Sequence, residues 1–338
     1  MRGGGEIAGD EGSVADLGEW GVIAALKARM PAGALTLVGI GDDSAVVTTP
    51  SGSVVAAVDL LIEGRHFRRE WSSAYDVGVK AAARSLADIA AMGAVNTALL
   101  VGLAAPGTLP ARWAADLAEG LAFEATRAGA GVVGGDTARA DAVTLSVTAL
   151  GDLEGRRPVL RSGARPGDVI AVAGLLGRAA AGLALLTAGV AQASAAPSSP
   201  EALSSLVAAQ LRPAPPYDAG PEAARLGATA MIDVSDGLLA DLGHLAAASG
   251  VHVNVRTARL APSPALREAA ASLPASAPSS MALEWVLTGG EDHALVASFP
   301  PEVTLPARWR VIGEVDSGAG VTVDGAPHEG PAGWQHFR

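Results

Sequence analysis

The chain contains no cysteine, and this absence excludes several kinds of site. Thiolate catalysis, zinc–thiolate centres and disulfide bonds all need the sulfur atom that cysteine supplies. Lysine is almost as scarce, because Lys27 and Lys80 are the only two in the sequence. The phosphate-binding pattern G-x-x-x-x-G-K-[ST] is therefore missing too. If the protein binds phosphate, metal ions, arginine and backbone amides must neutralise it.

Aromatic residues make up only 4% of the chain, although 49% of it is hydrophobic. Its cores must therefore be built from Ala, Val, Leu and Ile. The formal net charge of −11 argues against a nucleic-acid-binding surface and against adhesion to anionic membranes. An acidic protein can still bind an anionic nucleotide when divalent cations bridge the two, so a phosphate ligand would predict metal dependence.

Long apolar runs are also missing. Residues 1–12 are Gly-rich and acidic, unlike a secretory signal. The longest apolar region, 169–190, is interrupted by Gly174, Gly177, Arg178 and Gly182, so it lacks the run of about 20 apolar residues that a membrane span requires. We therefore expect a strand, a turn and a helix there, and a soluble cytoplasmic protein.

The length of 338 residues favours two domains. We expect a disordered N-terminus over 1–15, an N-terminal domain over 16–152 and a C-terminal domain over 153–338, joined by the polar, Arg-rich linker 151–167. Hydrophobic periodicity and turn residues predict the elements of the first domain. They are helices over 15–29, 75–92 and 112–128, and strands over 35–40, 45–48, 54–61, 99–102 and 143–150.

The second domain restarts with a strand over 169–173 and a helix over 178–188. Further on we expect a helix over 237–249 and loops over 191–205 and 262–280. The remaining predictions are strands over 228–234, 251–255, 294–299 and 309–315, and a hairpin at 321–325. Strands and helices mixed in both halves predict an α/β (α+β) fold of two αβ sandwiches.

Five short segments place aspartate where an apolar run gives way to glycine or a polar turn. Carboxylates at strand ends beside flexible backbone suit a hard cation such as Mg²⁺. An ordinary polar turn is the alternative for most of them, since Gly and Asp are common turn residues. The segments are 39–43 with Asp42 and Asp43, 58–59, 134–137, 233–237 and 289–292.

Asp59 stands inside an apolar strand, where a carboxylate is costly unless it is paired or bound to metal. His66 follows closely and could contact a substrate or simply be a surface or core residue. On the 75–92 helix, Lys80, Arg84 and Asp88 share one face because they are four residues apart. Surface ion pairs are the simpler interpretation of that face; an acidic cluster with basic phosphate anchors is the alternative.

Segment 134–137 either forms an anion-binding turn through its backbone amides or simply ends a strand. Segment 233–237 is more specific. Strand alternation places Asp233 and Ser235 on one side, and Asp236 is predicted to cap the next helix, whose amides would attract phosphate. Capping does not explain Asp233, so a cation site is favoured.

Near the C-terminus, the Gly-Gly pair of segment 289–292 permits close backbone approach, or it forms a hairpin turn. Trp334 could stack on a flat ligand ring or pin the terminus.

Together and in this order, the motifs resemble the thiamine-monophosphate kinase family, which makes thiamine diphosphate with ATP. The resemblance extends from Gly39 to Phe337 through segments 39–43, 59–67, 85–93, 134–137, 161–168, 232–238 and 289–292. It implies a homodimer formed through N-terminal domains that bind ATP and Mg²⁺. The implied Mg²⁺ ligands are Asp43, Asp59, Asp88, Asp136, Asp233 and Asp236, with Asp42 and the backbone of Val58 as further candidates. The implied ATP contacts are Gly135, Asp136, Arg161 and Ser235, and those to thiamine monophosphate are His66, Glu291 and Trp334.

One position departs from the family, which commonly has a hydroxyl residue where this chain has Val58. A ligand there would have to be the backbone carbonyl. With thiamine monophosphate as the acceptor, whose phosphate is largely deprotonated at neutral pH, we expect direct in-line transfer of the γ-phosphoryl group, assisted by several Mg²⁺ ions and without a general base. The alternatives are a related ATP-dependent ligase of purine biosynthesis, similar to aminoimidazole ribonucleotide synthetase, and a non-catalytic nucleotide- or cation-binding module.

Overall fold

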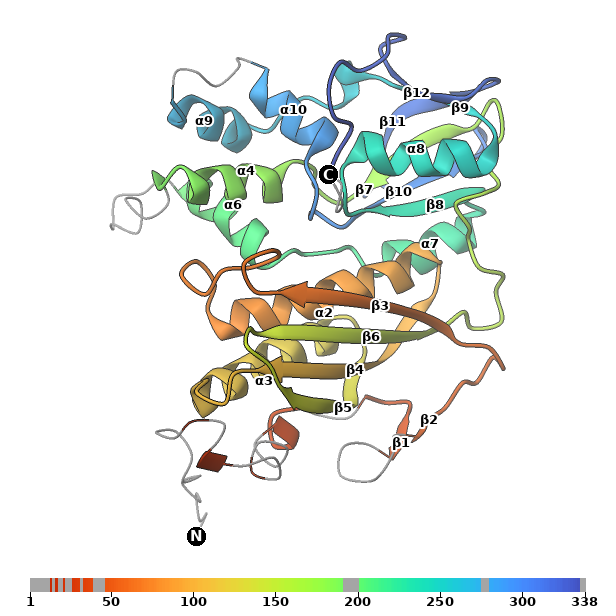
Figure 1. Ribbon diagram of the computed structural model, residues 1–338. Helices are drawn as coiled ribbons and strands as arrows, with labels where there is room; N and C mark the ends of the chain where they lie inside the picture. The colour runs from red at the N-terminus through yellow and green to blue at the C-terminus, as the bar shows by residue number, and fades with distance from the viewer. Residues whose placement is uncertain are drawn as a thin grey trace. The chain divides into compact units, whose positions relative to one another are not determined.

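A computed structural model describes residues 13, 16–17, 21, 26–30, 33–38, 46–190, 201–274 and 280–334 (Figure 1). The predicted disordered terminus except Ser13, most of the 15–29 helix, and the segment with Asp42 and Asp43 lie outside these residues. The chain forms two compact units. One comprises 1–86 and 96–152, and the other comprises 87–95 and 153–338.

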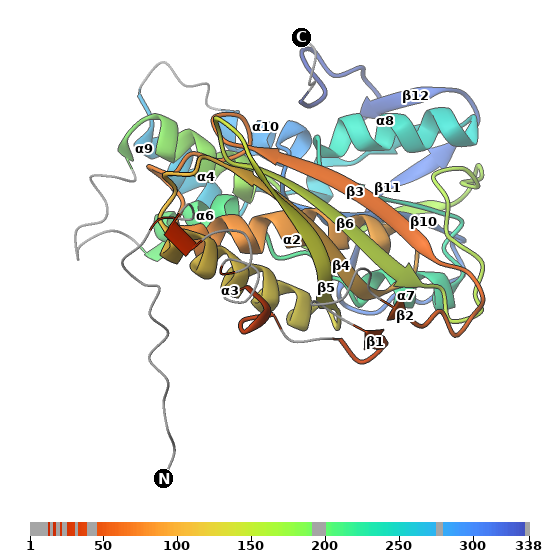
Figure 2. The same cartoon turned by 60° about the horizontal axis from the view of Figure 1, so that its bottom comes forward.

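The first unit is built on a mixed four-stranded sheet in the order β3-β6-β4-β5. β3 and β6 are antiparallel, whereas β4 and β5 are parallel. Two helices cover one face of this sheet, as Figure 2 shows. The strands are β3 (Val55–Ile62), β4 (Val95–Ala105), β5 (Gly131–Arg139) and β6 (Thr144–Asp152), and the helices are α2 (Ala74–Ala91) and α3 (Ala111–Arg127). A separate antiparallel pair consists of β1 (Thr36–Val38) and β2 (Val46–Val47).

Both helices predicted in this part of the chain are confirmed to within a residue or two. The prediction for 134–137 is wrong, because these residues lie inside β5 rather than in a turn. Gly135 allows close strand packing: a Cβ on this residue would lie 1.9 Å from the carbonyl oxygen of Val101 on β4. Segment 134–137 is therefore neither a phosphate nest nor a strand-ending turn.

The second unit contains a six-stranded sheet in the order β12-β9-β11-β7-β10-β8. Neighbouring strands are antiparallel except β12 and β9, which are parallel. The strands are β7 (Val169–Ala173), β8 (Ala230–Val234), β9 (His252–Val255), β10 (Ala294–Phe299), β11 (Trp309–Asp316) and β12 (Gly320–Val323).

Helices pack against this sheet and share its hydrophobic core. β8 and β10 are buried along their whole length, which explains why their sequences are apolar without alternation. The helices are α4 (Arg178–Thr187), α6 (Glu201–Leu211), α7 (Ala219–Leu226), α8 (Leu238–Ser249), α9 (Pro264–Ser272) and α10 (Met281–Thr288), with a 3₁₀ turn η1 (Thr257–Arg259).

Three predictions for this unit are corrected. The loop predicted over 191–205 is wrong for residues 201–205, which begin α6, and α7 was not predicted. The 262–280 loop contains α9 and reaches α10; α9 begins where the Ser263 side chain accepts a hydrogen bond from the Leu266 amide and proline occupies the first turn. The hairpin at 321–325 is mainly a parallel strand on β9 that ends in a tight turn.

The fold class is confirmed at the level of a two-domain α/β protein, with a mixed N-terminal sheet and a six-stranded C-terminal sheet, both accompanied by helices. The expected strand, turn and helix over 169–190 are confirmed as β7 and α4. No helix in the part of the chain that the structure describes is long and apolar enough to span a bilayer.

Candidate functional site

In the first unit, Asp59 projects from β3 towards α2. Its Oδ2 lies 2.9 Å from the hydroxyl of Ser85, and its Oδ1 lies 3.7 Å from the guanidinium of Arg84. These contacts offset the cost of placing a carboxylate in an apolar strand. Val58 points to the opposite face and is 64% exposed. A hydroxyl side chain at 58 would thus lie across the sheet from the Asp59 carboxylate.

The helix that carries Arg84 does not present a simple surface ion-pair face. Lys80 is only 3% exposed, and Asp88 is half-buried, in the part of α2 that groups with the second unit. The interpretation of Lys80, Arg84 and Asp88 as surface ion pairs is therefore wrong. Arg84 lies beside Asp59, one of the predicted metal ligands.

Asp136 lies on the exposed part of β5, where its Oδ1 accepts a hydrogen bond from the Thr137 amide at 2.8 Å. β5 and β3 are the two outer strands of the sheet. Three strand spacings, roughly 14 Å, separate Asp136 from Asp59. The sheet by itself does not bring these two carboxylates together.

His66 follows β3 in a turn that folds back on the strand. Its Nδ1 accepts a hydrogen bond from the Ile62 amide at 3.0 Å. In a neutral ring this leaves the proton on Nε2. The main chain therefore fixes the orientation of the imidazole and makes Nε2 a donor.

In the second unit, Asp233 is buried near the end of β8. Its Oδ2 lies 3.0 Å from Nδ1 of His293, which is buried as well. His293 itself has a positive φ of 51°, and its amide donates to the Val234 carbonyl. Such a conformation is uncommon for a residue with a side chain and persists where the surroundings enforce it. Asp233 therefore has a defined partner in the fold.

The loop between β8 and α8 is organised by a carboxylate that follows it. Oδ2 of Asp241 accepts hydrogen bonds from the amides of Ser235, Asp236 and Gly237, each at 3.1 Å. The N-cap residue of α8 is Gly237, so the prediction that Asp236 caps this helix is wrong. Because Asp241 occupies the loop amides, they are not free to bind phosphate. Burial, reinforced by the negative charge of Asp233, raises the pKa of Asp241 from 3.8 to about 7.

Segment 289–292 connects α10 to β10 and is not a hairpin. The Asp292 carboxylate accepts hydrogen bonds from the amides of Gly177 and Ala179, at 2.5 and 2.9 Å, at the start of α4. Burial raises the pKa of Asp292 to about 7. Glu291 has a φ of 69°, and its amide donates to the Ser235 carbonyl at 2.8 Å. Asp292 thus has a structural role at the start of α4, whereas Glu291 lies beside the loop between β8 and α8.

Three backbone segments meet at residues 235–237, and glycine is required at each contact. A Cβ on Gly237, Gly290 or Gly333 would lie 2.5 Å from the carbonyl oxygen of Thr288, Ser235 or Asp236 respectively. The amide of Trp334 also donates to the Asp236 carbonyl at 2.9 Å. The second unit therefore gathers four predicted site residues into one cluster: Ser235, Asp236, Glu291 and Trp334.

Arg161 lies outside that cluster. Its carbonyl accepts a hydrogen bond from the hydroxyl of Ser249, which also accepts from the amides of Gly163 and Ala164. Ser249 is the last residue of α8, so Arg161 lies at the far end of a helix about 18 Å long from Asp236. Its side chain is exposed.

Within the described residues, no three Asp, Glu or His side chains are arranged to hold a metal ion. The candidates are nevertheless carboxylates, the oxygen donors that Mg²⁺ prefers, and Asp136 and Asp236 are accessible to solvent. Their chemistry fits Mg²⁺. Asp43 lies outside the described part of the chain.

Sequence reasoning missed four residues that organise these sites: Ser85, Asp241, Ser249 and His293. Asp241 falls in the first turn of α8, where an acidic residue is ordinary, and the hydroxyls of Ser85 and Ser249 are ordinary helix residues. His293 follows Glu291 and Asp292 directly, and that adjacency was the available signal. Their partners are mostly distant in the sequence, so no local pattern identifies them.

Two family models match the chain. Residues 41–153 match the AIR synthase related protein, N-terminal domain, and residues 165–325 match the corresponding C-terminal domain. The thiamine-monophosphate kinase of Mycobacterium tuberculosis (strain ATCC 25618 / H37Rv) is 48% identical over 332 residues, which cover 98% of this chain and 95% of that protein.

Two solved structures are similar over most of both chains. The thiamine-monophosphate kinase from Stenotrophomonas maltophilia K279a has a TM-score of 0.76 and 34% identity, and the match covers 91% of this chain and 95% of that one. A structure described as AaThiL complexed with AMPPCP and TMP also has a TM-score of 0.76, with 33% identity, and covers 95% and 98%.

Proposed function

The chain belongs to the thiamine-monophosphate kinase family, and we infer that it is a phosphotransferase that uses ATP to convert thiamine monophosphate to thiamine diphosphate. The observation that carries this conclusion is 48% identity over nearly the whole chain to a thiamine-monophosphate kinase. The relative complexed with AMPPCP and TMP supports a site for a nucleotide and for thiamine monophosphate in the same fold. A reaction that consumes ATP is consistent with a cytoplasmic protein.

The acceptor in this reaction is already a good nucleophile. A phosphate monoester has its second pKa near about 6, so its oxygen is largely deprotonated at neutral pH. A general base is unnecessary, and catalysis rests on in-line positioning and on cations that offset charge between two anions. The transfer is direct, without a phosphorylated enzyme. Recovery of a phosphoenzyme after incubation with ATP alone would refute this step.

Mg²⁺, when bound, neutralises charge on the phosphates of both substrates. Asp43, Asp59, Asp88, Asp136, Asp233 and Asp236 are proposed to hold it, with Asp42 and the Val58 carbonyl as further candidates. At Asp233 a metal would share the carboxylate with the ring of His293, because that ring lies 3.0 Å from Oδ2. Asp236 is more accessible, on a loop whose backbone Asp241 holds.

The remaining candidates divide between the two substrates. Gly135, Asp136, Arg161 and Ser235 are proposed to contact ATP, and His66, Glu291 and Trp334 to contact thiamine monophosphate. The grouping of Ser235 with Glu291 and Trp334 supports this division, because it places a proposed ATP contact next to proposed acceptor contacts. A phosphoryl transfer site requires that adjacency.

A homodimer formed through the first unit is the proposed assembly. Opposite α2 and α3, the outer face of β3 presents Val58 and Leu60, and Val54 precedes the strand; each of the three is more than half exposed. Apolar side chains on an outer strand form a surface that soluble proteins usually cover. A second copy would cover this face. Val58 would then contribute to the dimer interface.

Product formation tests the proposed function directly. Purified protein is incubated with ATP and thiamine monophosphate, with and without Mg²⁺, and thiamine diphosphate is measured. We expect product only when the metal is present. Formylglycinamidine ribonucleotide serves as the comparison substrate for the alternative ligase. ATP binding without turnover of either substrate would favour the non-catalytic module instead.

A further inference from the structure

The polypeptide after β12 forms an exposed segment that returns to the loop before α8. We call residues 324–334 the C-terminal strap. In Figure 1 it runs from β12 down between α10 and α8. Apart from His328 and Gly333, its residues are exposed, so few of its side chains hold it in place. Its path depends on a small number of identifiable contacts.

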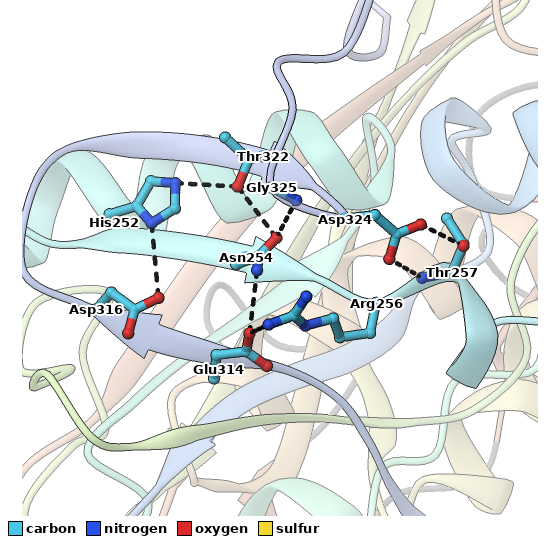
Figure 3. A network of polar contacts seen from close by, with 9 residues as sticks. All are labelled: His252, Asn254, Arg256, Thr257, Glu314, Asp316, Thr322, Asp324 and Gly325. Atoms are coloured by element: carbon cyan, nitrogen blue, oxygen red, sulfur yellow. Dashed lines mark hydrogen bonds and ion pairs between the residues drawn. The ribbon is translucent and has the colours of Figure 1, made fainter.

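The root of the strap is fixed by polar contacts on the outer strands of the sheet (Figure 3). Oδ1 of Asn254 accepts hydrogen bonds from the amide of Gly325 at 2.9 Å and from the hydroxyl of Thr322 at 3.1 Å. The Asp324 carboxylate accepts a hydrogen bond from the Thr257 amide at 3.1 Å. The turn from which the strap departs is therefore tied to β9 and η1.

The far end of the strap is fixed by two helices. Nε2 of His328 lies 3.1 Å from Oε1 of Glu284 on α10, and the Ala332 carbonyl accepts from the Ala240 amide on α8 at 3.2 Å. At the tip, Gly333 packs directly on the Asp236 carbonyl, and the Trp334 amide donates to the same oxygen. A Cβ at 333 would meet both that oxygen, at 2.5 Å, and the Cβ of Ala240, at 2.8 Å.

These contacts matter because the Trp334 side chain is 62% exposed. An indole so exposed gains little from packing, so its direction is set by the backbone that carries it. We propose that Gly333 and His328 are positioning residues which hold the strap against α8 and α10 and so present Trp334 to the acceptor substrate. This inference rests on the proposed function. According to this proposal, the strap affects the binding of thiamine monophosphate and not the binding of ATP.

The test compares two glycine-to-alanine variants, one at the contact between the strap and α8 and one elsewhere on α8. Gly333→Ala inserts a methyl group where the backbone leaves no space. Gly243→Ala, on the neighbouring helix α8, inserts one where no atom lies within 4 Å. Amide hydrogen exchange of the 326–334 peptide reports attachment of the strap. KM for thiamine monophosphate and KM for ATP report its function.

We expect Gly333→Ala to speed exchange of this peptide and to raise KM for thiamine monophosphate about tenfold, a loss typical of one substrate contact. KM for ATP should stay within about twofold, and Gly243→Ala should match wild type. His328→Ala should change the same two quantities in the same direction. His328→Gln, whose amide can still donate to Glu284, should restore them.

Two results would overturn the proposal. One is a Gly333→Ala variant that matches Gly243→Ala in exchange and in KM. The other is an equal rise in both KM values, which would mean that the 235–237 loop, rather than Trp334, is disturbed. If the wild type makes no thiamine diphosphate, the proposed function fails separately. The exchange rates of the four variants then decide whether Gly333 and His328 hold the strap.

Discussion

The backbone amide of Trp334 donates a hydrogen bond to the carbonyl oxygen of Asp236, with 2.9 Å between the two atoms. The contact joins the C-terminal segment to the loop before α8, two places far apart in the sequence. Asp236 is a proposed Mg²⁺ ligand and Trp334 a proposed contact for thiamine monophosphate. One main-chain hydrogen bond thus connects a proposed metal ligand with a proposed contact of the acceptor substrate.

Asp236→Asn should lower kcat/KM for thiamine monophosphate by about 100-fold or more and raise the Mg²⁺ concentration needed for half-maximal rate, because a neutral amide is a weaker ligand for a hard cation. Steady-state rates across a Mg²⁺ titration measure both effects. Asp316→Asn is the matched control, since Asp316 is an exposed carboxylate of the same unit on β11. Equal Mg²⁺ requirements in the two variants would contradict a metal role for Asp236.

Asp241 should make the protein less stable as the pH rises from about 4 to about 7. Its pKa is about 7 in the fold and 3.8 as a free side chain, so the folded state binds the extra proton over this interval. The contribution of Asp241 to the free energy of unfolding is therefore largest at the acidic end of the interval and is lost as Asp241 ionises in the folded protein. Asp241→Asn should reduce the difference in free energy of unfolding between pH 5 and pH 8. Urea denaturation at both pH values, without divalent metal, measures it.

Asp292 contributes to the same pH dependence, because its pKa is also raised to about 7. The difference should therefore shrink in Asp241→Asn without vanishing, and it should shrink further when Asp292→Asn is added. An unchanged pH dependence in the double variant would show that neither carboxylate is the source.

Val58→Asp should convert the proposed dimer to a monomer, because it places a charge in the centre of the apolar face of β3. Light scattering coupled to size-exclusion chromatography measures the mass. Leu183→Asp is the control, because Leu183 is also an exposed aliphatic residue but lies on α4 of the second unit, where it is 42% exposed. A wild-type monomer, or a dimer that survives Val58→Asp, would exclude this interface.

Leu206→Ala should destabilise the protein by about 2–5 kcal/mol, because it removes a fully buried side chain of α6 from the core of the second unit. Leu183→Ala, at a position that is 42% exposed, should destabilise the protein by much less, about 1 kcal/mol. Urea denaturation of both variants provides the comparison. Similar stabilities would mean that α6 is not packed against this core.

The elements that sequence reasoning located well are those with strong local signals. Gly93 follows the helix predicted over 75–92, and Gly250 follows the one predicted over 237–249; both glycines have positive φ, which suits the residues that end a helix. β7 and β10 match their predicted bounds because each is an apolar run bounded by polar or turn residues. In contrast, α6 and α9 lie in Ala- and Ser-rich stretches, where helix and loop compositions are alike.

The predictions for the site also succeeded where a local sequence pattern was distinctive and failed where it was not. The ordered acidic motifs were enough to indicate the family, because each is a short local pattern. Some of these motifs gave wrong structural predictions, because the same local pattern can arise for two different physical reasons. The glycines at 134 and 135 indicated a turn, but both lie inside β5, and Gly135 permits its close contact with β4. Asp236 indicated a helix cap, but Asp241 from within the helix binds the loop amides.

Composition and local patterns were enough to establish the two-domain α/β organisation and the resemblance to a kinase family, and they predicted a site that relies on carboxylates and arginine in place of lysine and cysteine. Tertiary structure decided what each acid contacts: Asp59 meets Ser85 and Arg84, Asp233 meets His293, and Asp292 caps α4. It also decided that Trp334 lies at Asp236. The reason is physical, since burial and hydrogen bonding depend on partners that chain folding brings from distant positions, and no local sequence pattern encodes those distances.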